Sequence, residues 1–85
     1  MTYRVELRPA ALRDLARVEN PWRLKIARKI DALAANPRPP GVEKLAGSDN
    51  RYRVRSGDYR IVYEIHDRVL LILAVRSGHR REVYR

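Results

Sequence analysis

The chain has 85 residues, the size of a single domain, and we expect residues 1–85 to fold as one unit. It contains no cysteine, which excludes disulfides and thiolate metal sites, and no apolar stretch approaches the roughly 20 residues of a membrane span. Sixteen arginines and three lysines against ten acidic residues give a net charge of +9, which favours a polyanionic partner such as nucleic acid or an acidic protein. Without a signal-peptide pattern, the chain is expected to be cytoplasmic and to have no membrane partner.

The first half of the chain predicts one strand and two helices. Residues 2–7 alternate apolar and charged side chains, as a half-buried strand does. Pro9 suits the first turn of a helix, and the apolar residues after it recur at helical spacing: Ala11, Leu12, Leu15 and Val18. A second helix is expected after Asn20 as its cap, ending at residues 36–37, with an apolar stripe of Trp22, Ile26, Ile30 and Leu33. The short connection predicts an antiparallel helical hairpin with Trp22 in the core.

The second half predicts a connector and then strands. Residues 38–41 contain two consecutive prolines, which favour a stiff connector from the helices to a sheet. The next segment leads into the sheet, and we expect Lys44 to project toward its charged face. Three strands follow, separated by turns at residues 56–58 and 67–68; they span residues 51–55, 59–66 and 69–75.

Alternation along these strands separates an apolar face from a charged face. Tyr52 and Val54 point to one side, and Arg53 and Arg55 to the other, where Arg60 of the next strand joins them. The last strand is almost wholly apolar, which predicts burial on both faces. We therefore predict an α+β fold in the order β-α-α-β-β-β. A four-stranded antiparallel sheet, with the first strand at its edge, carries the two-helix hairpin on one face and leaves the arginine face open.

This order of elements, together with the segments YRVRSGDYRIVYEI and SGHRREVYR, resembles the RelE/ParE superfamily of toxins from bacterial toxin–antitoxin pairs. The opening YRVEL, the PAALRDLARV helix, the NPRPPGVEKLAG link and the closing GHRREVY match in kind and spacing along the whole chain. The resemblance implies the toxin of a type II system, with a cognate acidic antitoxin that is partly disordered until bound. RelE-like members cleave messenger RNA on the ribosome, which implies the ribosome and mRNA as partners and neither metal nor another cofactor. The alternatives are a ParE-like gyrase inhibitor that acts by binding, and an inactive homologue that only binds its antitoxin.

For a RelE-like ribonuclease, the resemblance also implies site residues. The strand cations fall on Arg53, Arg55 and Arg60; the later arginine falls on Arg80 or on Arg81, and the C-terminal tyrosine on Tyr84. Arginine stays protonated in proteins, so Arg55 is interpreted as stabilising phosphate charge rather than as a base. His79 or Tyr84 is the hypothesised proton-transfer group. The alternatives are a solvated loop position for His79 and packing on the sheet for Tyr84.

The sequence thus gives two sets of candidate residues. The catalytic candidates are Arg55, Arg60, His79, Arg80 and Tyr84. The RNA-binding candidates are Lys44, Arg51, Arg53, Arg55 and Arg81. No metal ligand is predicted.

Overall fold

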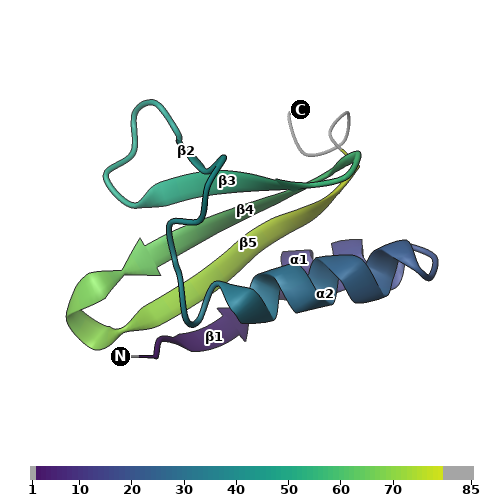
Figure 1. The fold of residues 1–85 in the computed structure, drawn as a ribbon, viewed down its shortest axis with the longest axis horizontal. Coiled ribbons are helices and arrows are strands. Elements are labelled where there is room, and N and C mark those ends of the chain that lie inside the picture. Colours follow the sequence, from purple (N-terminus) through teal and green to yellow (C-terminus); the bar gives the residue numbers. More distant parts are fainter. Residues whose placement is uncertain (1, 80–85) are drawn as a thin grey trace.

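The computed structural model describes residues 2–79, with His79 described by its backbone alone. Two helices and five strands follow one another along the chain, with a single 3-10 turn before the last strand. Their bounds are β1 (Arg4–Leu7), α1 (Pro9–Ala16), α2 (Trp22–Ala32), β2 (Glu43–Lys44), β3 (Arg51–Ser56), β4 (Tyr59–His66), η1 (Asp67–Val69) and β5 (Leu71–His79). The strands form one sheet in the order β1-β5-β4-β3-β2, and the helices lie side by side along it (Figure 1).

The meander of β3, β4 and β5 is antiparallel, as the sequence predicts. The first strand does join its edge, but β1 runs parallel to β5, with Arg4 opposite Leu71. The sheet is therefore mixed and has five strands, and the prediction of four purely antiparallel strands was wrong in this respect. A period-two pattern marks a strand and its faces but carries no direction. The direction of β1 instead depends on the path of the helices. After α2, the chain comes back to the start of β1, where the backbone N–H of Tyr3 donates to the carbonyl of Ala34 at 2.8 Å.

The fifth strand is β2, a two-residue segment that pairs with β3 at the other edge of the sheet. Glu43 lies opposite Arg53, and Lys44 lies opposite Tyr52. Residues directly opposite each other in an antiparallel pair share a face. Glu43 therefore belongs to the arginine face, and Lys44 belongs to the side of Tyr52. The prediction that Lys44 projects toward the arginine face was wrong, because that prediction depended on a register that the sequence does not specify.

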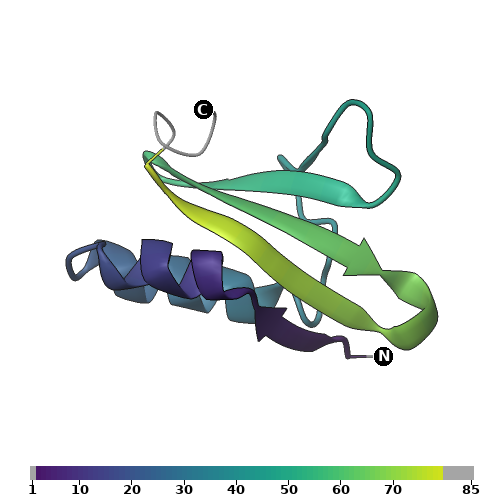
Figure 2. The same ribbon diagram turned by 180° about the vertical axis from the view of Figure 1, so that it is seen from behind.

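Both helices cover the same face of the sheet and leave the other face open (Figures 1 and 2). Helix α1 packs along β5, and α2 packs on β3 and β4. Between the layers lies one apolar core, formed by Val18, Ile26, Ile30, Leu33, Tyr52, Val54, Ile61, Tyr63, Ile65 and Ile72. The alternation along β3 and β4 predicts which of their residues face the core, and the structure confirms this for Tyr52, Val54, Ile61, Tyr63 and Ile65. Consequently α1 and α2 do not cover the side chains on the opposite face of β3 and β4.

Two apolar residues predicted for the core lie outside it. Trp22 is 45 % exposed and Leu12 is 54 % exposed. Trp22 is the first residue of α2, and Figures 1 and 2 show the connected ends of the helices extending beyond the sheet. There the indole contacts Lys25, whose ammonium nitrogen is 4.8 Å from the ring centroid. Asn20 is not the cap of α2, since Pro21 precedes the helix and no side chain caps it.

The last strand is flanked by β1 and β4, but only its helix-facing side is buried. Ile72 and Ala74 are fully buried, whereas Leu71 and Leu73 are half-buried on the open face. The prediction of burial on both faces was wrong because the helices cover one face only. The strand also begins later than predicted, since Leu70 takes a left-handed backbone conformation (φ 51°) that closes the turn after η1.

Candidate functional site

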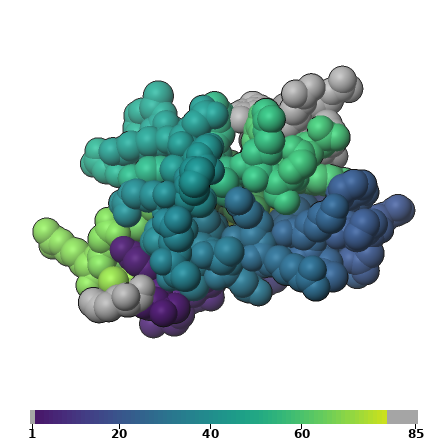
Figure 3. Space-filling view, in the orientation of Figure 1, coloured from purple at the N-terminus to yellow at the C-terminus, as the bar shows by residue number. Residues whose placement is uncertain are grey.

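The connector between α2 and β2 is anchored to the sheet and to the turn after β4, and this positions β2 beside β3. The buried phenol of Tyr63 donates a hydrogen bond of 2.7 Å to the carbonyl of Pro37. Burial raises the pKa of Tyr63 to about 12, so the hydroxyl keeps its proton. Arg38 forms an ion pair of 3.0 Å with Asp67, and its guanidinium lies 5.2 Å from the ring centroid of Tyr52. Figure 3 shows the connector crossing the front of the molecule from the helical layer to the sheet.

Two arginines face each other on the open side of the sheet. Arg55 and Arg60 are direct partners across the β3–β4 hairpin, on either side of a tight turn in which Gly57 has a positive φ of 61°. Arg53 follows on the same face of β3, opposite Val62. Like charges placed directly opposite each other on a sheet are destabilising. Arg55 forms no ion pair with a carboxylate in the part of the chain that the structure describes. An anion held between these guanidinium groups would relieve their repulsion.

These arginines line a pocket of about 230 Å³, which we call the arginine pocket. Its wall includes one carboxylate, that of Glu43, which accepts a hydrogen bond of 2.7 Å from Arg53. This hydrogen bond and the nearby charges of Arg53, Arg60 and Arg55 hold the pKa of Glu43 below its ordinary value. The lining residues are Gly41, Glu43, Arg53, Val54, Arg55 and Arg60. The sequence prediction brings Arg53, Arg55 and Arg60 together correctly but misses Glu43, because a strand of two residues leaves no alternation to detect.

A glycine lies on the other side of Arg60. Gly78 of β5 is its direct partner in the β4–β5 ladder, with a backbone φ of 150° that favours glycine. In the two ladders, Arg60 therefore lies between Arg55 of β3 and Gly78 of β5, and Gly78 is buried.

The end of β5 is fixed to α1 through a single carboxylate. Asp14 accepts hydrogen bonds from the guanidinium of Arg76 (2.7 Å) and from the backbone N–H of Ser77 (3.1 Å). The hydroxyl of Ser77, which is buried, donates to the carbonyl of Ala11 at 3.3 Å. These contacts set the course of the strand up to His79, whose backbone lies opposite Tyr59.

The remaining predicted site residues follow this anchored strand. Arg80, Arg81 and Tyr84 lie outside the described residues, as does the side chain of His79. Their roles remain predictions.

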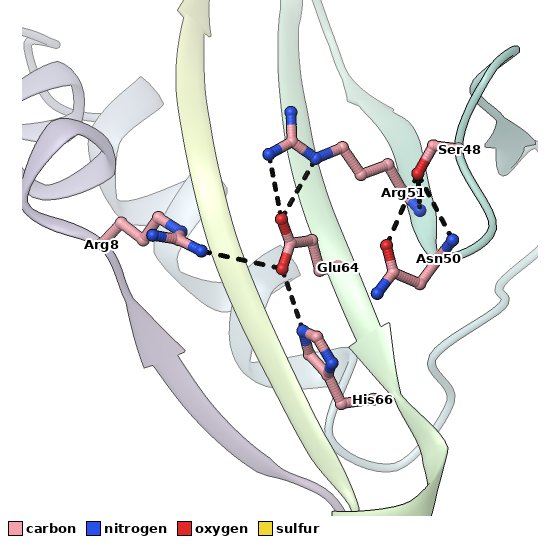
Figure 4. Close-up of polar contacts among 6 residues, drawn as sticks. All are labelled: Arg8, Ser48, Asn50, Arg51, Glu64 and His66. Atoms are coloured by element: carbon pink, nitrogen blue, oxygen red, sulfur yellow. Dashed lines mark hydrogen bonds and ion pairs between the residues drawn. The ribbon is translucent and has the colours of Figure 1, made fainter.

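A second polar cluster occupies the open face toward the other end of β3 and β4, and sequence reasoning missed it (Figure 4). Its centre is Glu64, which is only 7 % exposed. The carboxylate accepts from Arg51 at 3.0 and 3.1 Å, lies 2.9 Å from Nε2 of His66, and lies 3.9 Å from the guanidinium of Arg8. Burial alone would raise the pKa of Glu64, but the hydrogen bonds from His66 and Arg51 outweigh it, so the pKa is lowered. We call these four residues the Glu64 cluster.

Among residues 2–79, no helix has the length and apolar character needed to cross a membrane. No three His, Asp or Glu side chains within this range gather so that they could hold a metal ion.

The chain is similar to known toxins over nearly its whole length. Residues 5–84 match the family described as the ParE toxin of the type II toxin–antitoxin system parDE. A protein of Methanocaldococcus jannaschii that carries the name toxin RelE1 is 34 % identical over 87 residues, covering 96 % of this chain and 93 % of the relative.

Two solved structures share the fold. The archaeal RelE–RelB complex from Pyrococcus horikoshii matches with a TM-score of 0.82 at 28 % identity, covering 94 % of this chain and 97 % of that one. A mutant of the Escherichia coli toxin RelE in the free state matches with a TM-score of 0.81 at 26 % identity, covering 99 % and 92 %.

Proposed function

Because the chain belongs to the RelE/ParE superfamily of type II toxins, we propose that it is an endonuclease that cleaves messenger RNA on the ribosome. One observation carries this proposal: the cross-strand pair of Arg55 and Arg60 lines a pocket on the sheet face that the helices leave open. Guanidinium groups bind phosphate through paired N–H donors and keep their charge at all physiological pH values. Two such groups on a rigid hairpin are suited to hold one scissile phosphate.

In the proposed reaction, the ribose 2′-oxygen attacks the adjacent phosphorus and the bond from phosphorus to the 5′-oxygen breaks. The 2′-hydroxyl loses its proton, the 5′-oxygen gains one, and the products are a 2′,3′-cyclic phosphate and a 5′-hydroxyl. Negative charge on the non-bridging oxygens rises in the transition state. Arg60 and Arg55 stabilise that charge, and Arg53 contributes from the adjoining position on β3. Arg80 and Arg81 supply further positive charge from the segment after β5.

Proton transfer needs groups other than arginine, because a guanidinium does not give up its proton. His79 and Tyr84 are the candidates that the sequence provides. The arginine pocket adds the carboxylate of Glu43, which is ionised near neutral pH and can accept a proton. We propose that the base is Glu43 or His79 and that the acid is Tyr84 or His79.

The proposed protein partner is an acidic antitoxin. The similar chain from Pyrococcus horikoshii was solved as a RelE–RelB complex, and the net charge of +9 suits an acidic binding segment. Such a segment would neutralise the toxin if it covered the arginine pocket. Its coexpression should therefore restore growth to cells in which the toxin is induced.

Primer extension on cellular transcripts after induction tests the proposal. Codon-positioned cuts that disappear when the antitoxin is coexpressed would support it. Intact transcripts together with an SOS response would overturn it in favour of gyrase inhibition. Intact transcripts without growth arrest would overturn it in favour of a homologue that only binds its antitoxin.

A further inference from the structure

The Glu64 cluster shares the open face with the arginine pocket but differs from it in charge. Arg51 and Arg8 both contact the buried carboxylate of Glu64, and their side chains remain 45 % and 50 % exposed. Figure 4 shows the two arginines approaching Glu64 from opposite sides, one from β3 and one from the end of β1. A carboxylate already compensates Arg51, and Arg51 is therefore a weaker phosphate ligand than Arg55.

A guanidinium held by a carboxylate is well suited to another kind of contact. In Arg51, two N–H donors are held by one carboxylate oxygen, which orients the guanidinium plane, and 45 % of the side chain remains exposed. Unpaired bases of RNA stack on such planes and on imidazole rings. Arg51 offers this surface with two hydrogen bonds to Glu64, and His66 adds an imidazole that is 33 % exposed and bonded to the same carboxylate.

The burial of Glu64 indicates that the arrangement is built rather than incidental. Three side chains from separate segments converge on its carboxylate: Arg8 after β1, Arg51 on β3, and His66 on β4. Placing a charge where water is scarce costs free energy unless its hydrogen bonds are satisfied. Random surface ion pairs, by contrast, keep both partners in water. Because these side chains converge on it, Glu64 positions the guanidinium of Arg51 and the imidazole of His66.

From this arrangement we propose that the Glu64 cluster is a base-stacking subsite for single-stranded RNA, in which Glu64 orients the guanidinium of Arg51 against a nucleobase. The proposal rests on the proposed ribonuclease function. Arg51 lies four residues from Arg55 on the same face of β3, a separation of about 13 Å at the rise of a strand. One short RNA segment therefore reaches both places, with a phosphate in the arginine pocket and a base a few nucleotides away on Arg51.

The test is a binding measurement with a defined probe. A fluorescein-labelled hexa-adenylate with 2′-O-methyl riboses cannot undergo 2′-hydroxyl attack, and its bases can be replaced one at a time by abasic residues. For the wild-type chain, we expect an abasic residue at one or two adjacent positions to raise the Kd about 10-fold. Arg51→Lys keeps the charge and removes the plane, so it should raise the Kd of the intact probe by a similar factor and abolish the abasic effect. The dependence of Kd on salt concentration should not change, because the charge is the same.

The direction in which Glu64→Gln changes the Kd shows whether Glu64 acts by orienting Arg51 or only through its negative charge. The substitution adds one net positive charge, so a carboxylate that acted only as a counter-charge would weaken binding, and its removal would lower the Kd. A carboxylate that orients Arg51 gives the opposite result: the Kd rises and the abasic effect is lost. Circular dichroism and a thermal melt show whether the variant folds, and Arg51→Lys decides the question if it does not. Arg28→Lys, an exposed arginine on α2, is the matched control and should change neither the Kd nor the abasic effect.

The outcomes also separate this proposal from the proposed function. A chain that cuts transcripts but shows no abasic-sensitive position, or does not bind the probe, overturns the stacking subsite alone. A chain with the expected abasic pattern that cuts no transcript overturns the ribonuclease and leaves the subsite. If Arg51→Lys keeps the abasic pattern and instead weakens the complex with the antitoxin, the cluster belongs to a protein interface and the proposal is overturned.

Discussion

Arg55 and Arg60 lie directly opposite each other across the β3–β4 hairpin, on the sheet face opposite to helices α1 and α2. Each would be more stable with a neutral partner, because like charges in this position repel. Carboxylates on the same face pair with other arginines: Glu43 pairs with Arg53, and Glu64 pairs with Arg51. We place the scissile phosphate at the hairpin end of the sheet, where Arg55 and Arg60 meet.

The first prediction concerns this charge. Arg60→Ala should abolish growth arrest and slow cleavage on programmed ribosomes by about 100-fold or more, since a lost transition-state contact is typically worth about 3 kcal/mol. Arg53→Ala and Arg55→Ala should weaken RNA binding and reduce its salt dependence, with smaller effects on the chemical step. Arg28→Ala, on the helical layer, is the control and should stay toxic. Full toxicity of Arg60→Ala at equal expression would show that the arginine pocket is not the site.

The second prediction concerns proton transfer. If His79 transfers a proton, single-turnover cleavage should show an ionisation near the reference pKa of about 6.5, and His79→Gln should remove it and slow the step by about 100-fold. If Glu43 is the base instead, activity should fall only when the pH drops below the ordinary pKa of a glutamate. The reason is that the hydrogen bond from Arg53 and the charges of the neighbouring arginines lower the pKa of Glu43. Glu43→Gln should then give the loss. Tyr84→Phe tests the acid in the same assay.

Ribosome affinity, measured in parallel, should change little in these variants. A group that acts in the chemical step alters the rate and leaves ground-state binding nearly intact. If all three variants cleave at the wild-type rate, none of these groups transfers a proton, and catalysis by the ribosome itself would be favoured.

The third prediction concerns the glycine beside the arginine pocket. Gly78→Ala should lower toxicity, because the new methyl group occupies the open-face position next to Arg60 and the backbone φ of 150° is unfavourable for alanine. We expect a loss of stability of roughly 1–3 kcal/mol and a larger proportional loss of cleavage. Thermal melts and primer extension measure the two effects. Gly47→Ala, at a turn with positive φ away from the pocket, should reproduce the loss of stability without the additional loss of cleavage. Equal cleavage per folded molecule in both variants would contradict the prediction.

The fourth prediction concerns the pH dependence of stability. The hydrogen bond from Arg38, with a further one from Tyr3, lowers the pKa of Asp67. A carboxylate whose folded pKa is depressed stabilises the fold above its unfolded pKa of about 3.9 and loses that effect as pH falls through the folded value. Asp67→Asn should therefore lower the Tm at pH 7 and match the wild type near pH 2. Asp49→Asn is the control. A Tm difference that stays constant with pH would show that the ion pair contributes no pH-dependent stability.

The fifth prediction concerns the core. Ile30 is 2 % exposed, and Ile30→Ala should cost about 2–5 kcal/mol of unfolding free energy. Trp22→Ala should cost roughly 1 kcal/mol or less, since Trp22 is 45 % exposed, lies outside the core and contacts Lys25. Urea denaturation of both variants tests this ranking. A cost for Trp22→Ala as large as that for Ile30→Ala would place the indole in the core after all.

The alternation of β3 and β4 was enough to predict the meander, its buried face and the grouping of Arg53, Arg55 and Arg60. It succeeded because period two assigns each side chain to a face, and a hairpin turn fixes the register. The direction of β1 could not be predicted in this way, because it depends on where the helices return the chain. Trp22 was misplaced for a related reason: helical spacing gives an apolar stripe but not the point at which the helix leaves the sheet.

Two carboxylates of the open face, Glu64 and Glu43, show a second limit. The burial of Glu64 comes from Arg8 and Arg51, which are distant in sequence. Glu43 was missed because its strand consists of two residues. In both cases the information lies in long-range pairing, which a local pattern does not contain.

The edges of the sheet have a consequence for the behaviour of the protein at high concentration. Unpaired strand edges invite intermolecular pairing and fibril formation, and proteins limit this with short, charged edge strands. Here one edge is β1, whose outward residues Arg4 and Glu6 are charged, and the other is β2, which consists of Glu43 and Lys44 alone. Edge-to-edge association between copies of the protein is therefore disfavoured.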